Sequence, residues 1–246
     1  MKDRYDNIDE YISDLQAEIR KSDQCANHYY NLGVALLSKG DFVEAEDAFL
    51  SAVRNSPHLA EAYVQLGGLC LRRGDLDGCL RYNEEAANCR AKFAVPWSNI
   101  GFVHVQRGEV DKAISALEKA LRWDPDFVQA RATLASALFM KGDYDGCIEA
   151  GNAVLRKEPG FGPAWNNLAL AYFEKGDYAK AVKLYDKAVA AADNNYTAPA
   201  YLRKAALALI ATGDKAKAKS YLDRIVNNYP ASSDAREAEM LRGALE

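Results

Sequence analysis

The strongest constraint on this chain is a glycine that returns at a nearly constant spacing. Five of these glycines are 34 residues apart and a sixth follows after 37, at Gly40, Gly74, Gly108, Gly142, Gly176 and Gly213. An acidic residue follows each of them: Asp41, Asp75, Glu109, Asp143, Asp177 and Asp214. Four of the six periods also carry a proline 17 residues after the glycine, at Pro57, Pro125, Pro159 and Pro230. A fixed period of this length predicts a stacked array, in which each unit buries its apolar face against its neighbours.

Each period has the apolar pattern of two helices. In one period the spacing i, i+3, i+4, i+7 is occupied by Trp165, Leu168, Ala169 and Tyr172, and a second apolar face follows the glycine at Tyr178, Ala181, Tyr185 and Ala188. Glycine adopts the left-handed conformation that ends a helix, and an acid beside it suits the N-terminus of the next helix. The carboxylates after the glycines are therefore expected to be helix caps. Small residues recur where the two helices must approach closely, at Ala45, Cys79, Ala113, Cys147, Ala181 and Ala218.

The order of residues within a period resembles a known family. One period reads Tyr29, Leu32, Gly33, Leu36, Gly40, Ala45, Phe49, Ala52 and Pro57, and another reads Trp97, Ile100, Gly101, His104, Gly108, Ala113, Leu117, Ala120 and Pro125. This order is similar to that of the tetratricopeptide repeat (TPR) family. The resemblance implies an all-α fold, a right-handed α-solenoid of six stacked helix-turn-helix repeats with N- and C-terminal capping helices. The six units span residues 26–232, as 26–59, 60–93, 94–127, 128–161, 162–195 and 199–232. The fourth unit is expected to be the loosest, because Arg131 replaces an aromatic and Gly151 lies in its second helix.

The two ends differ from the repeats. Within residues 1–25, Tyr5, Ile8, Ile12, Leu15 and Ile19 predict an amphipathic helix over 4–21, which would cap the first repeat, dimerise or lie in the groove. Residues 233–246 are expected to form a C-terminal capping helix. Residues 1–25 carry four basic and seven acidic side chains, whereas residues 199–232 carry six basic and two acidic. These opposite charges make self-assembly into a dimer or a head-to-tail array the alternative function.

Composition argues against several classes of function. The formal net charge is −4, without the clustered Lys and Arg that binding to nucleic acid or to a membrane surface requires. No apolar run reaches the roughly 18 residues that span a bilayer, and the acidic N-terminus is unlike a secretory signal, so a cytoplasmic location is expected. The five cysteines form no CxxC pair, and His28, His58 and His104 are scattered through the repeat. We therefore expect neither an enzyme nor a bound metal or cofactor.

What the family resemblance implies about function is binding of a peptide or helix in a groove lined by the first helix of each unit. The sixth place of the six units reads Asn31, Gln65, Asn99, Thr133, Asn167 and Lys204. An amide carries both a donor and an acceptor, so a row of amides can pair with a peptide backbone. The neighbouring Asn166 is expected to face the same groove, and Arg203 and Lys204 are expected to hold an acidic end of a ligand near the sixth unit.

The other groove places are largely apolar. They are Tyr30, Val34, Leu37, Val64, Leu71, Phe102, Val105, Phe139, Met140, Leu170, Phe173, Leu207 and Ile210. Phe102, Phe139 and Phe173 are expected to be the most exposed of them. The predicted function is a non-enzymatic protein–protein interaction scaffold that binds an apolar or amphipathic segment of a partner.

Overall fold

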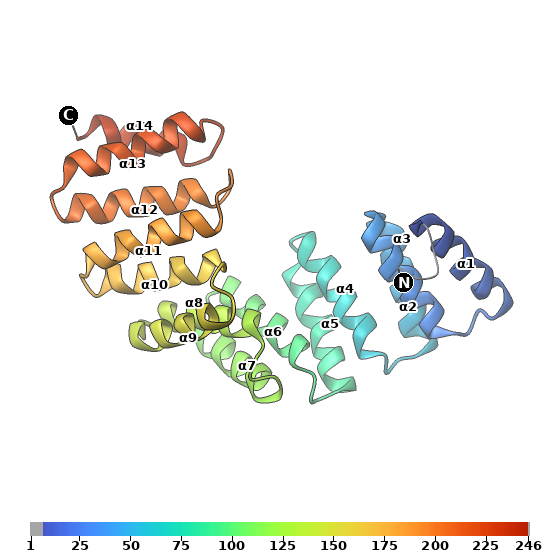
Figure 1. The fold of residues 1–246 in the computed structure, drawn as a ribbon. Helices are drawn as coiled ribbons and strands as arrows, with labels where there is room; N and C mark the ends of the chain where they lie inside the picture. Colours follow the sequence, from blue (N-terminus) through green and yellow to red (C-terminus); the bar gives the residue numbers. More distant parts are fainter. Residues whose placement is uncertain (1–6, 246) are drawn as a thin grey trace. The chain divides into compact units, whose positions relative to one another are not determined.

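The computed structural model describes residues 7–245, and these residues form helices and connecting loops without a strand. The helices are α1 (Ile8–Lys21), α2 (Ala26–Lys39), α3 (Phe42–Asn55), α4 (Ala60–Arg72), α5 (Leu76–Cys89), α6 (Ala94–Gln106), α7 (Val110–Trp123), α8 (Val128–Lys141), α9 (Tyr144–Lys157), α10 (Gly162–Glu174), α11 (Tyr178–Ala191), α12 (Ala198–Ala211), α13 (Lys215–Asn228) and α14 (Ala235–Gly243) (Figure 1). The chain divides into two compact units. The first unit comprises Met1–Arg107 and Ser115–Pro125, and the second comprises Gly108–Ile114 and Asp126–Glu246. Each unit is an all-α stack of helices. The exact limits of the six repeats stay a prediction.

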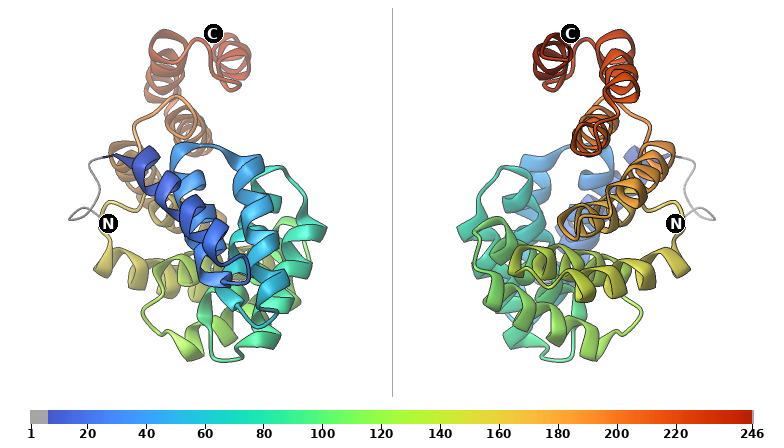
Figure 2. Two further views of the ribbon diagram at one scale, coloured as in Figure 1. Left: turned by 90° about the vertical axis from the view of Figure 1, so that its right-hand side faces the viewer. Right: turned by 90° about the vertical axis from the view of Figure 1, so that its left-hand side faces the viewer.

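The turns between paired helices form as the sequence predicts. All six periodic glycines have a positive φ, between 71° and 95°. Four of the acids that follow accept a hydrogen bond from the backbone N–H three residues later: Asp75 at 2.8 Å, Asp143 at 2.9 Å, Asp177 at 3.1 Å and Asp214 at 3.0 Å. Asp41 makes no such bond and lies 3.5 Å from the ammonium of Lys39. Within each unit the paired helices lie against each other, for example α2 with α3 and α12 with α13 (Figure 2).

Small side chains at the helix–helix contact are buried throughout the chain. The six predicted close-approach residues are at most 1% exposed. Burial raises the pKa of the Cys79 thiol to about 11 and that of Cys147 to about 12. Both therefore remain protonated thiols at neutral pH and behave as small apolar residues.

Gly151 is tightly packed, so the expectation that it would loosen its repeat was wrong. It occupies the place that Phe49 and Tyr185 take in other periods, 102 residues after the first and 34 before the second. A Cβ added to Gly151 would collide with the Cδ1 atom of Leu168. Leu168 from α10 is 3% exposed and fills the space that an aromatic ring fills elsewhere.

Both terminal helices pack against their neighbours in the same unit. Ile12 and Leu15 of α1 are buried in the cluster that contains Phe49 and Leu66, whereas Tyr5 lies outside the described residues. Asn7 caps α1 by accepting a hydrogen bond from the N–H of Glu10 at 2.8 Å. At the other end, Ala235 and Ala238 of α14 are buried in the core of the second unit. The apolar face of α1 is thus already covered by the first repeats.

Candidate functional site

The predicted binding surface lies on the first helix of each pair. In the first unit these helices are α2, α4 and α6, and in the second they are α8, α10 and α12. We call the predicted partner-binding residues on these helices, together with the exposed groove residue Met140, the first-helix wall. Its members are Tyr30, Asn31, Val34, Gln65, Asn99 and Phe102 in the first unit, and Thr133, Phe139, Met140, Asn166, Asn167, Leu170, Phe173, Arg203 and Lys204 in the second.

In the first unit the wall amides differ in their surroundings. Asn31 is exposed and Gln65 is half-buried. Asn99 is half-buried, and its Nδ2 donates to the Oδ1 atom of Asn83 at 2.9 Å. Tyr30 lies with its ring centroid 5.8 Å from that of Phe49. The donor of Asn99 is therefore engaged within the protein, while Asn31 is open to solvent.

Asn83 is a polar residue in the core that was not among the predicted site residues. It is fully buried on α5, and its Nδ2 also donates to the carbonyl oxygen of Cys79 at 2.8 Å. Gly67 makes room for it, because a Cβ at Gly67 would collide with the Asn83 amide. The signal for Asn83 was its place in the period, 34 residues after Phe49, where a large apolar side chain is expected. A buried amide at such a place must be hydrogen-bonded, and Asn83 is.

In the second unit a polar network runs across three successive first helices. The Nδ2 of Asn167 on α10 donates to the Oγ of Ser136 on α8 at 2.8 Å, and the Nζ of Lys204 on α12 donates to the Oδ1 of Asn166 at 3.0 Å. The Asn166 and Asn167 amides lie 3.5 Å apart, Nδ2 to Oδ1. Asn167 is 8% exposed, and Thr133 is 7% exposed with its hydroxyl donating to the carbonyl of Gln129. Asn167 joins α10 to α8, and Thr133 bonds within its own helix. Half-buried Asn166 and Lys204 retain access to solvent.

Two basic residues on α12 have different roles. The Nε of Arg203 donates to Asp234 at 2.7 Å, and its Nη1 donates to Glu237 at 3.0 Å, so Arg203 anchors α14. The ammonium of Lys204 donates instead to the neutral amide of Asn166. Burial, together with the charge of Arg203, lowers the pKa of Lys204, and Asp234 partly opposes this change. Arg203 is therefore saturated by carboxylates of its own chain, and Lys204 pairs directly with no carboxylate in the part of the chain that the structure describes.

The aromatic wall residues are less exposed than predicted. Phe102, Phe139 and Phe173 are all half-buried. The ring of Phe139 lies 5.7 Å from that of Tyr144, and the ring of Phe173 lies 5.0 Å from that of Tyr178, edge to face. Each of these tyrosines begins the second helix of its pair and covers one side of the phenylalanine.

Met140 is the exposed apolar residue of the wall in the second unit. It is 47% exposed and follows Phe139 near the end of α8. Leu170 is half-buried, like Phe173 on the same helix.

The structure also bears on two other kinds of site. Within residues 7–245 no three His, Cys, Asp or Glu side chains are gathered closely enough to hold a metal ion. None of the helices in the same range has the length and apolar character needed to cross a membrane.

Three family models match the sequence, and all three describe tetratricopeptide repeats. A "Cytochrome c-type biogenesis protein H TPR domain" model matches residues 90–199, and two "Tetratricopeptide repeat" models match residues 172–245 and 12–60. A comparison with curated protein sequences found no match.

Solved structures of repeat proteins are similar to this chain. YrrB, described as a TPR protein with an unusual peptide-binding site, is 21% identical with a TM-score of 0.61, over 73% of this chain and 93% of that one. PilW, described as a widely conserved type IV pilus biogenesis factor, is 18% identical with a TM-score of 0.77, over 86% and 97%. MamA from Desulfovibrio magneticus RS-1 is 21% identical with a TM-score of 0.62, over 71% and 97%. At these identities the likeness shows the fold alone.

Proposed function

Because this chain belongs to the tetratricopeptide repeat family, we propose that it is a non-enzymatic interaction scaffold whose first-helix wall binds an apolar or amphipathic segment of a partner protein. The wall in the second unit is the main binding surface in this proposal. It combines an exposed methionine, half-buried Leu170 and Phe173, and the Asn166–Lys204 pair. An amphipathic segment would meet both the apolar and the polar part.

The observation that carries the proposal is the state of Lys204. An ammonium that is half-buried against a neutral amide lacks the compensation that a carboxylate would give. A carboxylate of the partner would supply this compensating charge, at a site that is already partly buried. We therefore expect the bound segment to carry an acidic residue next to its apolar side chains.

Self-assembly receives less support from the same structure. The apolar residues of α1 pack against the first repeats, and its exposed face consists largely of polar residues such as Asp9, Glu10, Ser13 and Asp14. Burying such a face in a dimer would remove charged groups from water without an apolar gain. Concentration-dependent mass in light scattering would favour the self-assembly alternative.

Partner capture tests the proposal. The intact chain, a Met140→Glu/Lys204→Met variant and a Met240→Glu/Lys183→Met control are immobilised, and proteins retained from a lysate of the source organism are quantified. The control makes the same chemical changes in the same unit at exposed positions outside the wall, since Met240 is 70% exposed and Lys183 is exposed. We expect a protein retained by the intact chain and the control but reduced at least tenfold on the wall variant, about 1.4 kcal/mol or more.

Equal retention on all three would contradict the proposal. Circular dichroism must show equal helicity for each variant. The more drastic Phe139→Glu/Phe173→Glu variant should also abolish capture, but both rings pack on tyrosines, so its helicity and melting temperature must be measured before its capture is interpreted.

A further inference from the structure

A ladder of ion pairs follows the glycine turns. The residue directly before each of the first five periodic glycines is basic: Lys39, Arg73, Arg107, Lys141 and Lys175. Four of these residues pair with an acid 30 residues earlier, as Lys39–Asp9, Arg107–Asp77, Lys141–Asp111 and Lys175–Asp145. The acid is the second residue of its helix in every case. We call each pair a rung and the set the turn-edge ladder.

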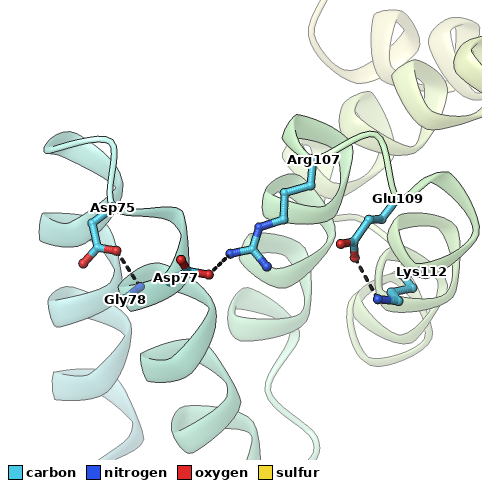
Figure 3. A network of polar contacts seen from close by, with 6 residues as sticks. All are labelled: Asp75, Asp77, Gly78, Arg107, Glu109 and Lys112. Atoms are coloured by element: carbon cyan, nitrogen blue, oxygen red, sulfur yellow. Dashed lines mark hydrogen bonds and ion pairs between the residues drawn. The ribbon is translucent and has the colours of Figure 1, made fainter.

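Figure 3 shows one rung in the first unit. Asp75 caps α5 by accepting from the N–H of Gly78, and Asp77, two residues further on, reaches the guanidinium of Arg107 at the end of α6. In the second unit, Glu109 lies beside a turn glycine and pairs with Lys112, 3.0 Å away.

The ladder lacks one rung in the first unit. The residue 30 positions before Arg73 is Val43, which is 71% exposed at the second position of α3. Arg73 turns instead to Glu46 one helical turn further on, and its Nη2 donates to Glu46 Oε1 at 3.0 Å. An exposed valine thus stands where the other rungs carry aspartate.

A cleft of about 200 Å³ lies at the missing rung. It is lined by Phe42, Val43, Leu69, Arg72 and Arg73. An engineered apolar cavity of about 150 Å³ is large enough for benzene, so this cleft has room for a single apolar side chain. The guanidinium of Arg72 lies 3.7 Å from the centroid of the Phe42 ring and forms no ion pair with a described residue.

We propose that this cleft is a second docking site, for a partner protein segment in which an apolar side chain is adjacent to Asp or Glu. The apolar side chain enters between Phe42, Val43 and Leu69, and the carboxylate takes the place of the missing rung, within reach of Arg72 and Arg73. The other rungs show that a carboxylate at this place meets the basic residue before the next glycine. A guanidinium has five N–H donors, so Arg73 can keep its pair with Glu46 and also donate to a second carboxylate. None of the five lining residues belongs to the first-helix wall.

A single substitution both completes the ladder and replaces an apolar lining residue of the cleft by a carboxylate. Val43→Asp places an acid in the first turn of α3, where the helix dipole favours it, and restores the rung to Arg73. Its matched control is Ala179→Asp, which adds the same charge at the second position of α11, where the ladder has no basic residue because Thr212 precedes the glycine. Neither position is buried, so both variants should fold with an unchanged or higher melting temperature.

The test uses a phage-displayed library of random twelve-residue peptides, selected on the intact chain and counted on the two variants by sequencing. Peptides that carry an apolar residue next to Asp or Glu should be enriched. As synthetic fluorescent peptides they should bind Val43→Asp at least tenfold more weakly than the intact chain or Ala179→Asp, and Arg72→Gln should weaken them as well. The Met140→Glu/Lys204→Met wall variant should bind these peptides normally, which separates this site from the one in the proposed function.

Three outcomes would overturn the proposal. The selection yields no peptide whose binding is weakened by Val43→Asp, or the enriched peptides lack an acidic residue. In the third outcome the intact chain is a dimer that Val43→Asp dissociates. The last would assign the cleft to a second copy of the chain.

Discussion

The turn edges and the first-helix wall of the same repeats differ in how uniform they are. At the turn edges, every periodic glycine has a positive φ, and four of the five aspartates after them cap the next helix. On the wall, the sixth place of the repeat holds an exposed amide in Asn31, a bridging amide in Asn99, a buried amide in Asn167 and a half-buried ammonium in Lys204. At the turn edges the positive φ restricts which residue types can occur. On the wall, any residue type that a helix tolerates can occur. The constant residues encode the fold, and the proposed function assigns recognition to the variable ones.

The largest expected effect comes from the interior behind the wall. Gly67→Ala would push a Cβ into the Asn83 amide and disturb its bonds to Cys79 and Asn99. Overpacking and a broken buried hydrogen bond each cost about 1–3 kcal/mol, so we expect a loss of about 2–4 kcal/mol in urea unfolding. The neighbouring Gly68→Ala has nothing within 4 Å and should instead stabilise α4 by about 0.5–1 kcal/mol. Equal effects of the two substitutions would show that Asn83 is not held as described.

A turn glycine should cost less, and for a different reason. Gly142 has a φ of 83°, and a Cβ added to it would meet nothing within 4 Å. Gly142→Ala therefore tests the backbone conformation alone, with an expected loss of about 1–2 kcal/mol in the free energy of unfolding. Gly160 is also exposed and unobstructed but has no positive φ, so Gly160→Ala should change stability by less than about 0.5 kcal/mol. A harmless Gly142→Ala would refute the conformational explanation of the 34-residue period.

The helix caps should have a smaller effect still. Asp143→Ala removes the 2.9 Å bond to the N–H of Gly146 and should cost about 1 kcal/mol. Asp41 stands at the same place in its own repeat but makes no cap bond, so Asp41→Ala should cost clearly less. Chemical denaturation of both variants compares the two positions directly, and an equal loss would mean that the acids act through charge rather than through capping.

The smallest effect concerns the pH dependence contributed by the wall. The folded-state pKa of Lys204 is lowered chiefly by burial, so between that pKa and the ordinary lysine pKa the unfolded chain binds more protons than the folded one. Stability contributed by this group therefore rises with pH across that window. Lys204→Met should remove this contribution, whereas the exposed control Lys183→Met should leave the pH profile unchanged. Superimposable profiles for the intact chain and Lys204→Met would contradict the assigned burial.

The sequence predicted the parts of the molecule that follow from local rules. The 34-residue period predicted the left-handed glycines, the helix caps at Asp75 and Asp143, and the burial of Cys79 and Cys147. Each depends on backbone geometry or on the approach of two adjacent helices, which a single repeat specifies.

The parts that escaped prediction depend on contacts between side chains. The exposure of Phe139 and Phe173 was overestimated because the position of Tyr144 and Tyr178 depends on side-chain rotamers. The Asn83–Asn99 bond joins helices of different repeats, and no local pattern indicates which amide meets which. Gly151 was predicted to loosen its repeat because the side chain that fills the space beside it, Leu168, comes from the next repeat.

The central claim, that the variable wall positions carry recognition, is tested most directly by site-specific photo-cross-linking. A photoreactive phenylalanine analogue is placed at Met140 on the wall or at Met240 on α14, both exposed methionines of the second unit. After irradiation with a lysate, the account predicts that Met140 yields a cross-link to a partner segment with apolar and acidic residues, and that Lys204→Met suppresses it. A partner cross-linked equally well from Met240, or a Met140 cross-link that persists in Lys204→Met, would contradict the claim.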